Sequence, residues 1–377
     1  MESPPLLEQI LLRPNDYIGS VEKHTQTLWV YESFPMMRRA VTYVPGLHMI
    51  FDEILVYATV SKQRDPSMDA LHVEIDVSEC RISVYNNAEG IPVELHQEEG
   101  VYVPEMIFAH LISTNYEGNN LKETTGVKLA NVFSTEFIIE TADGHCLKKY
   151  KQVFSENMGK KSEPEITDGK KGENWTRITF KPDLAKFNLT HLEQDVIALM
   201  RKRVFDVAAT LGETVHVVLD GQRLAVKDFS TYVNWHIISA KKKRPVELPR
   251  ICEKVSFVNG IATIRGGSHV DYMANRIATH VMNAVNDKNK NITVQVHDVK
   301  RHLWIFVNAR IENPTFDSQT KEFLMTPQES FRSNNCAFSD IFLNKVVSCG
   351  VVRNMFLCPG FKSSKKVSKP SESGGND

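Results

Sequence analysis

The segment VPGLHMIFDEILVYA, residues 44–58, carries the strongest structural signal in the chain. Pro45 stands near its start, where a residue without an N–H costs a helix little. Apolar side chains recur along it at spacings of three and four: Leu47, Ile50, Phe51, Ile54, Leu55 and Ala58. This spacing predicts a helix with one apolar stripe that faces a core.

Strand patterns follow this helix. Residues 71–77 alternate between apolar and polar side chains, and residues 81–85 repeat the pattern after a short polar turn, which predicts a hairpin. A second long helix is predicted over residues 192–208. Further strands are predicted at residues 137–141, 177–180 and 215–219. Mixed elements of this kind indicate an α/β or α+β first domain.

The second half of the chain has the pattern of another α/β unit. Strands are predicted at residues 255–258 and 303–307, with a long helix over residues 270–285 between them. The basic, proline-broken segment 241–250 is interpreted as a linker or loop, with a nuclear-import signal as the open alternative. Residues 362–377 are rich in Lys, Ser, Gly and Pro, which predicts disorder.

Composition narrows the class of protein. The 377 residues include 45 basic and 46 acidic side chains, a formal charge of −1, which argues against a simple basic nucleic-acid-binding surface. A hydrophobic share of 42% is typical of a globular chain, and the length favours two domains. No apolar run is long enough for a membrane span, and the first residues lack the pattern of a signal peptide. We expect a cytosolic or nuclear protein without a membrane partner.

The cysteines are widely spaced, with no CxxC pair. They are Cys80, Cys146, Cys252, Cys336, Cys349 and Cys358. A disulfide framework and a zinc site both lack support in this spacing. We expect reduced thiols, most of them buried.

Three features have residue types that suit chemistry. Glu53 lies within the first helix, the strand-end sequence NNAEG occupies residues 86–90, and the loop DSQTK occupies residues 317–321. Each also has an ordinary structural interpretation: a solvated helix face, a turn and a surface loop. Taken separately, none of them identifies a function.

The order and the sequences of these features resemble the amino-terminal ATPase region of eukaryotic type IIA DNA topoisomerases, members of the GHKL superfamily of nucleotide-binding proteins. The matching runs are LLRPNDYIGS (11–20), VPGLHMIFDEIL (44–55), SKQRDPSMD (61–69), FVNGIATIRGGSHVDY (257–272) and ENPTFDSQTKE (312–322). The run KHTQTLWVYES, residues 23–33, is most similar to the plant form. The resemblance spans nearly the whole chain. It implies a two-layer GHKL (Bergerat) ATPase sandwich followed by a transducer domain with a ribosomal-protein-like fold.

The resemblance also implies roles for single residues, with ATP and Mg²⁺ as cofactors. Glu53 matches the general base that deprotonates the attacking water, and Lys321 matches the lysine that neutralises charge on the γ-phosphate. Asn86 matches the contact to the adenine amino group, and Gly90 is expected to let the backbone approach the nucleotide. The other expected ATP-binding residues are Ser113, Thr114, Asn115, Gly126, Lys128, Gln319 and Thr320.

The sequence departs from the family at the phosphates and the metal. Tyr57 occupies the position of the Mg²⁺-binding asparagine, so loss of that ligand is expected. The glycine-rich phosphate lid, TGGRNGYGAKL in the family, is shortened by six residues to TGVKL, residues 125–129. Ala88 replaces a glycine of the strand-end motif, and about twenty family residues have no counterpart between Arg250 and Lys254. Impaired ATP binding is therefore expected.

The expected organisation is a leader (1–5), a GHKL ATPase-like domain (6–234), a transducer domain (235–357) and a disordered tail (358–377). Nothing after residue 357 resembles the strand-cleavage domains, so DNA cleavage by this chain alone is not expected.

Two functions remain open. The chain is either an ATP-gate fragment linked to ATP-dependent change of DNA topology, or a non-catalytic pseudo-ATPase that modulates full-length topoisomerase II. A decayed or wrongly joined gene product is the third alternative. Expected partners are DNA, bound weakly, and a second copy or full-length topoisomerase II in a dimer, with the nucleus as the expected location.

Overall fold

The computed structural model describes residues 5–34, 36–111, 119–243, 253–288, 293–332 and 338–357. The chain divides into two compact units. The first comprises Met1–Ser239, Asn259–Ile261 and Ser318–Thr320, and the second comprises Ala240–Val258, Ala262–Asp317 and Lys321–Asp377.

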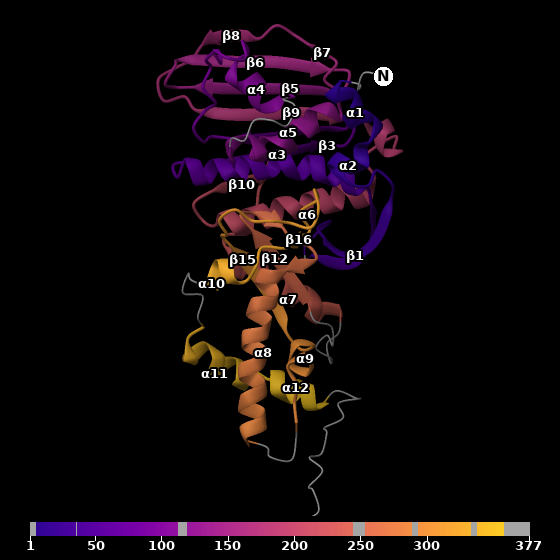
Figure 1. Ribbon diagram of the computed structural model, residues 1–377, viewed down its shortest axis with the longest axis vertical. Helices are drawn as coiled ribbons and strands as arrows, with labels where there is room; N and C mark the ends of the chain where they lie inside the picture. The colour runs from indigo at the N-terminus through magenta and orange to yellow at the C-terminus, as the bar shows by residue number, and fades with distance from the viewer. Residues whose placement is uncertain are drawn as a thin grey trace, which may run out of the picture. The chain divides into compact units, whose positions relative to one another are not determined.

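A nine-stranded sheet forms one layer of the first unit, with strand order β11-β10-β3-β4-β9-β5-β6-β7 and β8 paired with β6 (Figure 1). The predicted hairpin is confirmed, since β3 and β4 pair antiparallel with Asp76 opposite Arg81. β10 joins β3 in parallel. The strands are β3 (Ala70–Asp76), β4 (Arg81–Asn86), β5 (Ser134–Asp143), β6 (Lys148–Ser155), β7 (Lys160–Lys161), β8 (Glu165–Asp168), β9 (Trp175–Pro182), β10 (His216–Leu219) and β11 (Gln222–Arg223).

Helices form the second layer of this unit. The helical elements of this unit are α1 (Leu6–Leu12), α2 (Pro14–Ile18), α3 (Pro45–Arg64), α4 (Val103–Phe108), α5 (Asn119–Val132), the 3₁₀ turn η1 (Leu184–Phe187), α6 (Gln194–Leu211) and the part of α7 (Phe229–Lys243) that precedes Ala240. The predicted first helix is confirmed as α3, which packs against α5, α6 and β4. In β4 every second residue, Ile82, Val84 and Asn86, is buried, so one face of the sheet meets the helices. The result is a two-layer sandwich.

A separate hairpin of β1 (His24–Val30) and β2 (Met37–Tyr43) belongs to the same unit. Asp195, at the start of α6, holds it: its carboxylate accepts Nη1–H of Arg39 at 2.6 Å and the backbone N–H of Thr42 at 2.7 Å.

The second unit is a smaller α/β assembly, as predicted. β12 (Glu253–Val258) pairs in parallel with β15 (Trp304–Ala309), and α8 (Ser268–Lys288) follows β12 in the chain. Its apolar core includes Val270, Ala278, Val281 and Ile305. The remaining elements are β13 (Ile261–Ala262), β14 (Gly266–Gly267), α9 (Val296–Lys300), β16 (Phe323–Leu324), α10 (Glu329–Arg332), α11 (Asp340–Ser348) and α12 (Val351–Leu357).

Two expectations from the sequence are wrong. The loop predicted over 241–250 is wrong for residues 241–243, which are helical because lysine and alanine favour helix and extend α7 to Lys243, while residues 244–250 lie outside the described ranges. Burial of most cysteines fails for the three that the structure describes: Cys80 and Cys146 are half-exposed and Cys349 is exposed. Cys80 has a left-handed φ of 49°, which places it in the β3–β4 turn rather than in a core.

Within the described ranges, no helix is long and apolar enough to cross a membrane. The segment predicted to be disordered, residues 362–377, lies outside those ranges, as do Cys252, Cys336 and Cys358.

Candidate functional site

Glu53 is buried on α3, with 7% of its surface exposed, so the solvated interpretation of this glutamate is wrong. Its carboxyl group lies directly against Gly126 of α5. A Cβ added at Gly126 would lie 1.9 Å from Oε2 and 2.2 Å from Cδ of Glu53, far inside van der Waals contact. Only glycine therefore fits at position 126 while Glu53 keeps this conformation.

The shortened lid is part of helix α5 rather than a loop. Gly126 and Lys128 lie well inside Asn119–Val132, so their N–H groups belong to the interior of a helix. Interior N–H groups donate to carbonyls four residues back, and only the first four of a helix remain free for an anion. Gly126 and Lys128 consequently cannot offer the backbone donors with which a glycine-rich lid surrounds phosphates.

Lys128 is almost fully buried, with 6% of its surface exposed. Desolvation lowers the pKa of its ammonium group. Within the described ranges its ammonium group has no hydrogen bond or ion pair. A buried charge is costly unless it is paired with an opposite charge, so binding of an anion would stabilise this ammonium group. Lys128 therefore remains a candidate phosphate contact.

The strand-end motif is built on one buried and one half-buried amide side chain. Asn86 is 3% exposed, and its Oδ1 accepts the N–H of Ala88 at 3.2 Å. The sequence motif includes Asn87 but did not reveal its structural role. Its Oδ1 accepts the N–H of Ala70 at 2.8 Å, and its Nδ2 donates to Asp69 at 2.6 Å. These bonds fix the end of β4 against the start of β3.

Gly90 has a reason within the protein itself for being glycine. A Cβ there would lie 1.7 Å from the carbonyl oxygen of Ala142 in β5. Close approach of a nucleotide at Gly90 stays a prediction from the sequence, and the structure adds close approach of two backbone segments as a second reason for this glycine.

Buried side chains of β5 hold the segment after Gly90. Thr141 Oγ1 accepts the N–H of Ile91 at 3.0 Å, and Asp143 Oδ2 accepts the N–H of Val93 at 3.2 Å. Burial alone would raise the pKa of Asp143. Its carboxylate accepts hydrogen bonds from the side chain and backbone N–H of Cys146 and from the backbone N–H of His145, and these bonds lower the pKa overall. Neither Thr141 nor Asp143 was predicted from the sequence, because no local motif marks a buried Thr or Asp within a strand.

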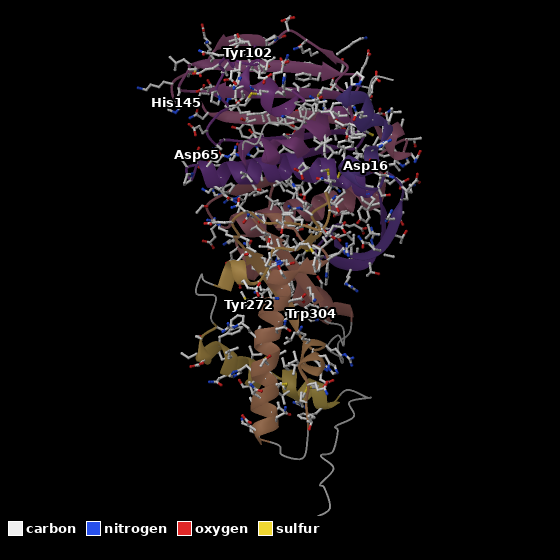
Figure 2. All side chains as sticks on the ribbon, viewed as in Figure 1. Asp16, Asp65, Tyr102, His145, Tyr272 and Trp304 are labelled. Atoms are coloured by element: carbon white, nitrogen blue, oxygen red, sulfur yellow. The ribbon has the colours of Figure 1, made fainter. Side chains whose placement is uncertain are left out.

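Glu89 ties the same loop to the end of α3. Its N–H donates to Asp65 Oδ2 at 2.7 Å, and its carboxylate lies 3.7 Å from His145. Figure 2 labels Asp65 and His145 along one edge of the first unit, the edge to which Glu89 links them. The pair with His145 is largely exposed and so contributes little to stability.

The metal position does not fit Mg²⁺. The Tyr57 ring packs against Phe108 with centroids 5.0 Å apart, and burial raises the pKa of its phenol to about 12. A neutral phenol is a poor ligand for a small hard cation. The next hydroxyls on α3 donate to their own helix: Thr59 to Val56 O at 2.7 Å and Ser61 to Tyr57 O at 3.1 Å.

The remaining expected residues are only partly placed. Gln319 and Thr320 belong to the first unit, where a Cβ added at Gly19 would meet the Thr320 methyl at 2.9 Å. Lys321 belongs to the second unit and has a left-handed φ of 54°. The loop before it is anchored by Arg265, which contacts Asp317 at 2.9 Å. Ser113, Thr114 and Asn115 lie outside the described residues.

Comparison with known proteins identifies the class. A family model described as DNA gyrase B matches residues 251–347. DNA topoisomerase 2 of Arabidopsis thaliana is 57% identical over 388 residues, covering 96% of this chain and 26% of the relative. DNA topoisomerase 2-alpha of Homo sapiens is 44% identical over 389 residues, covering 96% and 25%. The chain therefore spans about a quarter of the curated relatives that it matches.

Solved structures show the same similarity to type II topoisomerases. The ATPase region of Saccharomyces cerevisiae topoisomerase II is 37% identical with a TM-score of 0.85, covering 95% of this chain and 98% of that one. The ATPase and transducer domains of Balamuthia mandrillaris topoisomerase II give 38% and 0.85. Thermus thermophilus gyrase B, at 19% identity and a TM-score of 0.63, shows the shared fold alone. The chain belongs to the type II topoisomerase family and is homologous to its ATPase and transducer region.

The plant match also supports the two gaps in the sequence. It extends over 388 positions yet covers 96% of 377 residues, which leaves about 26 positions of the relative without a counterpart here. The six lid residues and about twenty near Arg250 that the sequence predicts to be missing add up to the same number.

Proposed function

We propose that this chain is an ATPase and transducer module of topoisomerase II type with impaired nucleotide handling. ATP is its expected ligand, Glu53 its general base, and Lys321 the lysine that contacts the γ-phosphate. The observation that carries the proposal is the contact of Glu53 with Gly126 inside α5. The general base is retained, but a helix occupies the position at which the family has a phosphate-binding loop.

Energies indicate how large the impairment is. A hydrogen bond to a charged group contributes about 1.5–3 kcal/mol. Loss of two or three lid donors would remove about 3–9 kcal/mol, comparable with the ~8 kcal/mol of a micromolar affinity. Tyr57 adds to this deficit, because it cannot help Mg²⁺ to neutralise the phosphates. Weak binding and slow or absent hydrolysis follow.

Calorimetric titration with ATP and a phosphate-release assay test this proposal. The matched region of the Arabidopsis relative serves as the positive comparison, and Glu53→Ala serves as the inactive control. We expect affinity far below that of the relative and turnover near that of Glu53→Ala. Turnover equal to that of the relative would contradict the proposed impairment.

The second candidate is a non-catalytic partner of a complete topoisomerase II. High identity over 96% of the chain, beside a degraded phosphate site, favours it. The chain would form a homodimer, or a heterodimer with the full-length enzyme in the nucleus, and bind DNA only weakly by itself. Co-purification with tagged full-length enzyme and sedimentation of the isolated chain test this candidate, and a strictly monomeric, non-associating chain would exclude it.

A further inference from the structure

A buried ion pair joins the helix that carries Glu53 to its neighbour. Arg203 of α6 donates through Nε to Asp52 Oδ1 of α3 at 2.6 Å, with side chains 2% and 20% exposed. The same guanidinium donates through Nη2 to the carbonyl of Gly260 at 2.5 Å. The turn Asn259–Ile261 that contains Gly260 belongs to the first unit. Arg203 thus makes two directed bonds in the interior of this unit.

Asp52 and Glu53 are consecutive on α3, so their side chains leave the helix about 100° apart. Glu53 faces Gly126 of α5, while Asp52 faces Arg203 of α6. A rotation of α3 about its axis would therefore disturb both contacts together. His48 lies one turn before Asp52 on α3 and cannot replace it as the anionic partner of Arg203. A histidine carries no negative charge, and burial lowers the pKa of His48 to about 4.

We propose that Arg203 is a positioning residue for Glu53. Its ion pair with Asp52 fixes the rotation of α3 and so places the Glu53 carboxylate. The inference rests on the proposed function, in which Glu53 is the base. A lysine cannot replace Arg203, because one ammonium group cannot reproduce the fork that reaches Asp52 and Gly260 together.

The neighbouring ion pair supplies a matched control. Lys202 Nζ lies 2.8 Å from Asp206 Oδ2, with side chains 11% and 1% exposed, and both residues belong to α6. Asp206 also accepts the hydroxyl of Tyr232 at 2.6 Å. Lys202→Met therefore removes a buried cation of similar burial without touching Asp52 or Glu53.

The experiment compares Arg203→Lys, Asp52→Asn and Lys202→Met with the native full chain. The first readout is the ¹³C signal of the Glu53 carboxyl in glutamate-labelled protein, assigned by its loss in Glu53→Gln. The second is ATP turnover, separated into kcat and KM. We expect the carboxyl signal to move in Arg203→Lys and Asp52→Asn but not in Lys202→Met. Where turnover is measurable, kcat should fall about tenfold or more with KM little changed.

The outcomes separate the two proposals. An unmoved Glu53 signal in Arg203→Lys, or an equal movement in Lys202→Met, overturns the positioning role. Absence of turnover in the native chain bears on hydrolysis alone, since the carboxyl signal still decides the role of Arg203. Thermal unfolding of all three variants checks that each is folded, and a folded Arg203→Lys with a native Glu53 signal rejects the inference.

Discussion

The contact between Glu53 and Gly126 leaves no room for a larger residue at position 126. In Gly126→Ala the new methyl meets Cγ, Cδ and Oε2 of Glu53, so we expect the free energy of unfolding to fall by about 1–3 kcal/mol. Glu53→Ala removes all three of those atoms. In that background the same substitution should stabilise by up to about 1 kcal/mol, because alanine favours helix over glycine.

Urea unfolding of the native chain, both single variants and the double variant measures this cycle. The same sign for Gly126→Ala in both backgrounds would show that Glu53 does not occupy the space beside Gly126.

Tyr57 offers a test of the lost metal ligand. Tyr57→Asn removes a ring that packs on Phe108, and we expect a loss of about 2–4 kcal/mol in stability. It also places an amide oxygen one turn after Glu53, where Mg²⁺ could bind. We expect Mg²⁺ to raise the Tm of this variant but not that of the native chain. Tyr57→Leu, which keeps an apolar contact and adds no ligand, is the control.

Single residues were predictable from the sequence where a motif carried them. Glu53 and Asn86 stand in recognisable runs, although their burial followed only from the fold. Thr141 and Asp143 could not be predicted, because their partners Ile91 and Val93 are about 50 residues away. The packing reason for Gly90 was hidden in the same way, since it depends on Ala142 of another strand.

Helix α5 is the element on which nucleotide affinity depends. Replacing residues 125–129 by TGGRNGYGAKL would interrupt the helix with glycines and restore free N–H donors. We expect the affinity for a non-hydrolysable ATP analogue to rise at least about tenfold, the effect of 1.4 kcal/mol, less than one charge-assisted bond.

Calorimetric titration checks this prediction, with an equally long insertion that replaces the glycines by alanines as the control. Equal affinity for the two insertions would mean that chain length rather than backbone donors sets binding.

Elements with strong periodicity were predictable, and those without it were not. α3, α6 and the β3–β4 hairpin have regular apolar spacing and stand where the pattern placed them. β1 was missed, because its first four residues are exposed and polar and it packs only at its end. The helical state of α5 was missed as well, since its apolar residues show only weak helical periodicity and the family comparison implied a loop.

The whole molecule should lose stability in mild acid through buried histidines. Burial lowers the pKa of His236 and of His269 to about 4 from an ordinary value of 6.5. Between these values the unfolded chain binds more protons than the folded chain. Their stabilisation is thus full above pH 6.5 and declines as the pH falls toward 4. Each of the two histidines should lower the free energy of unfolding by about 1 kcal/mol between pH 7 and 5.5.

Thermal unfolding across this pH range measures the effect. His236→Gln should flatten the decline in Tm, whereas His145→Gln, at a side chain that is 78% exposed, should leave it unchanged. A native Tm that is constant from pH 7 to 5.5 would contradict the prediction.

The sheet order has a consequence for synthesis of the chain. β9 (Trp175–Pro182) lies between β4 and β5, strands made about 90 and 30 residues earlier. Until Pro182 has left the ribosome, both earlier strands have an open edge, and such edges invite pairing with other chains. β10 joins β3 later still. A nascent chain that stalls before residue 182 is therefore a substrate for chaperones rather than a folded domain.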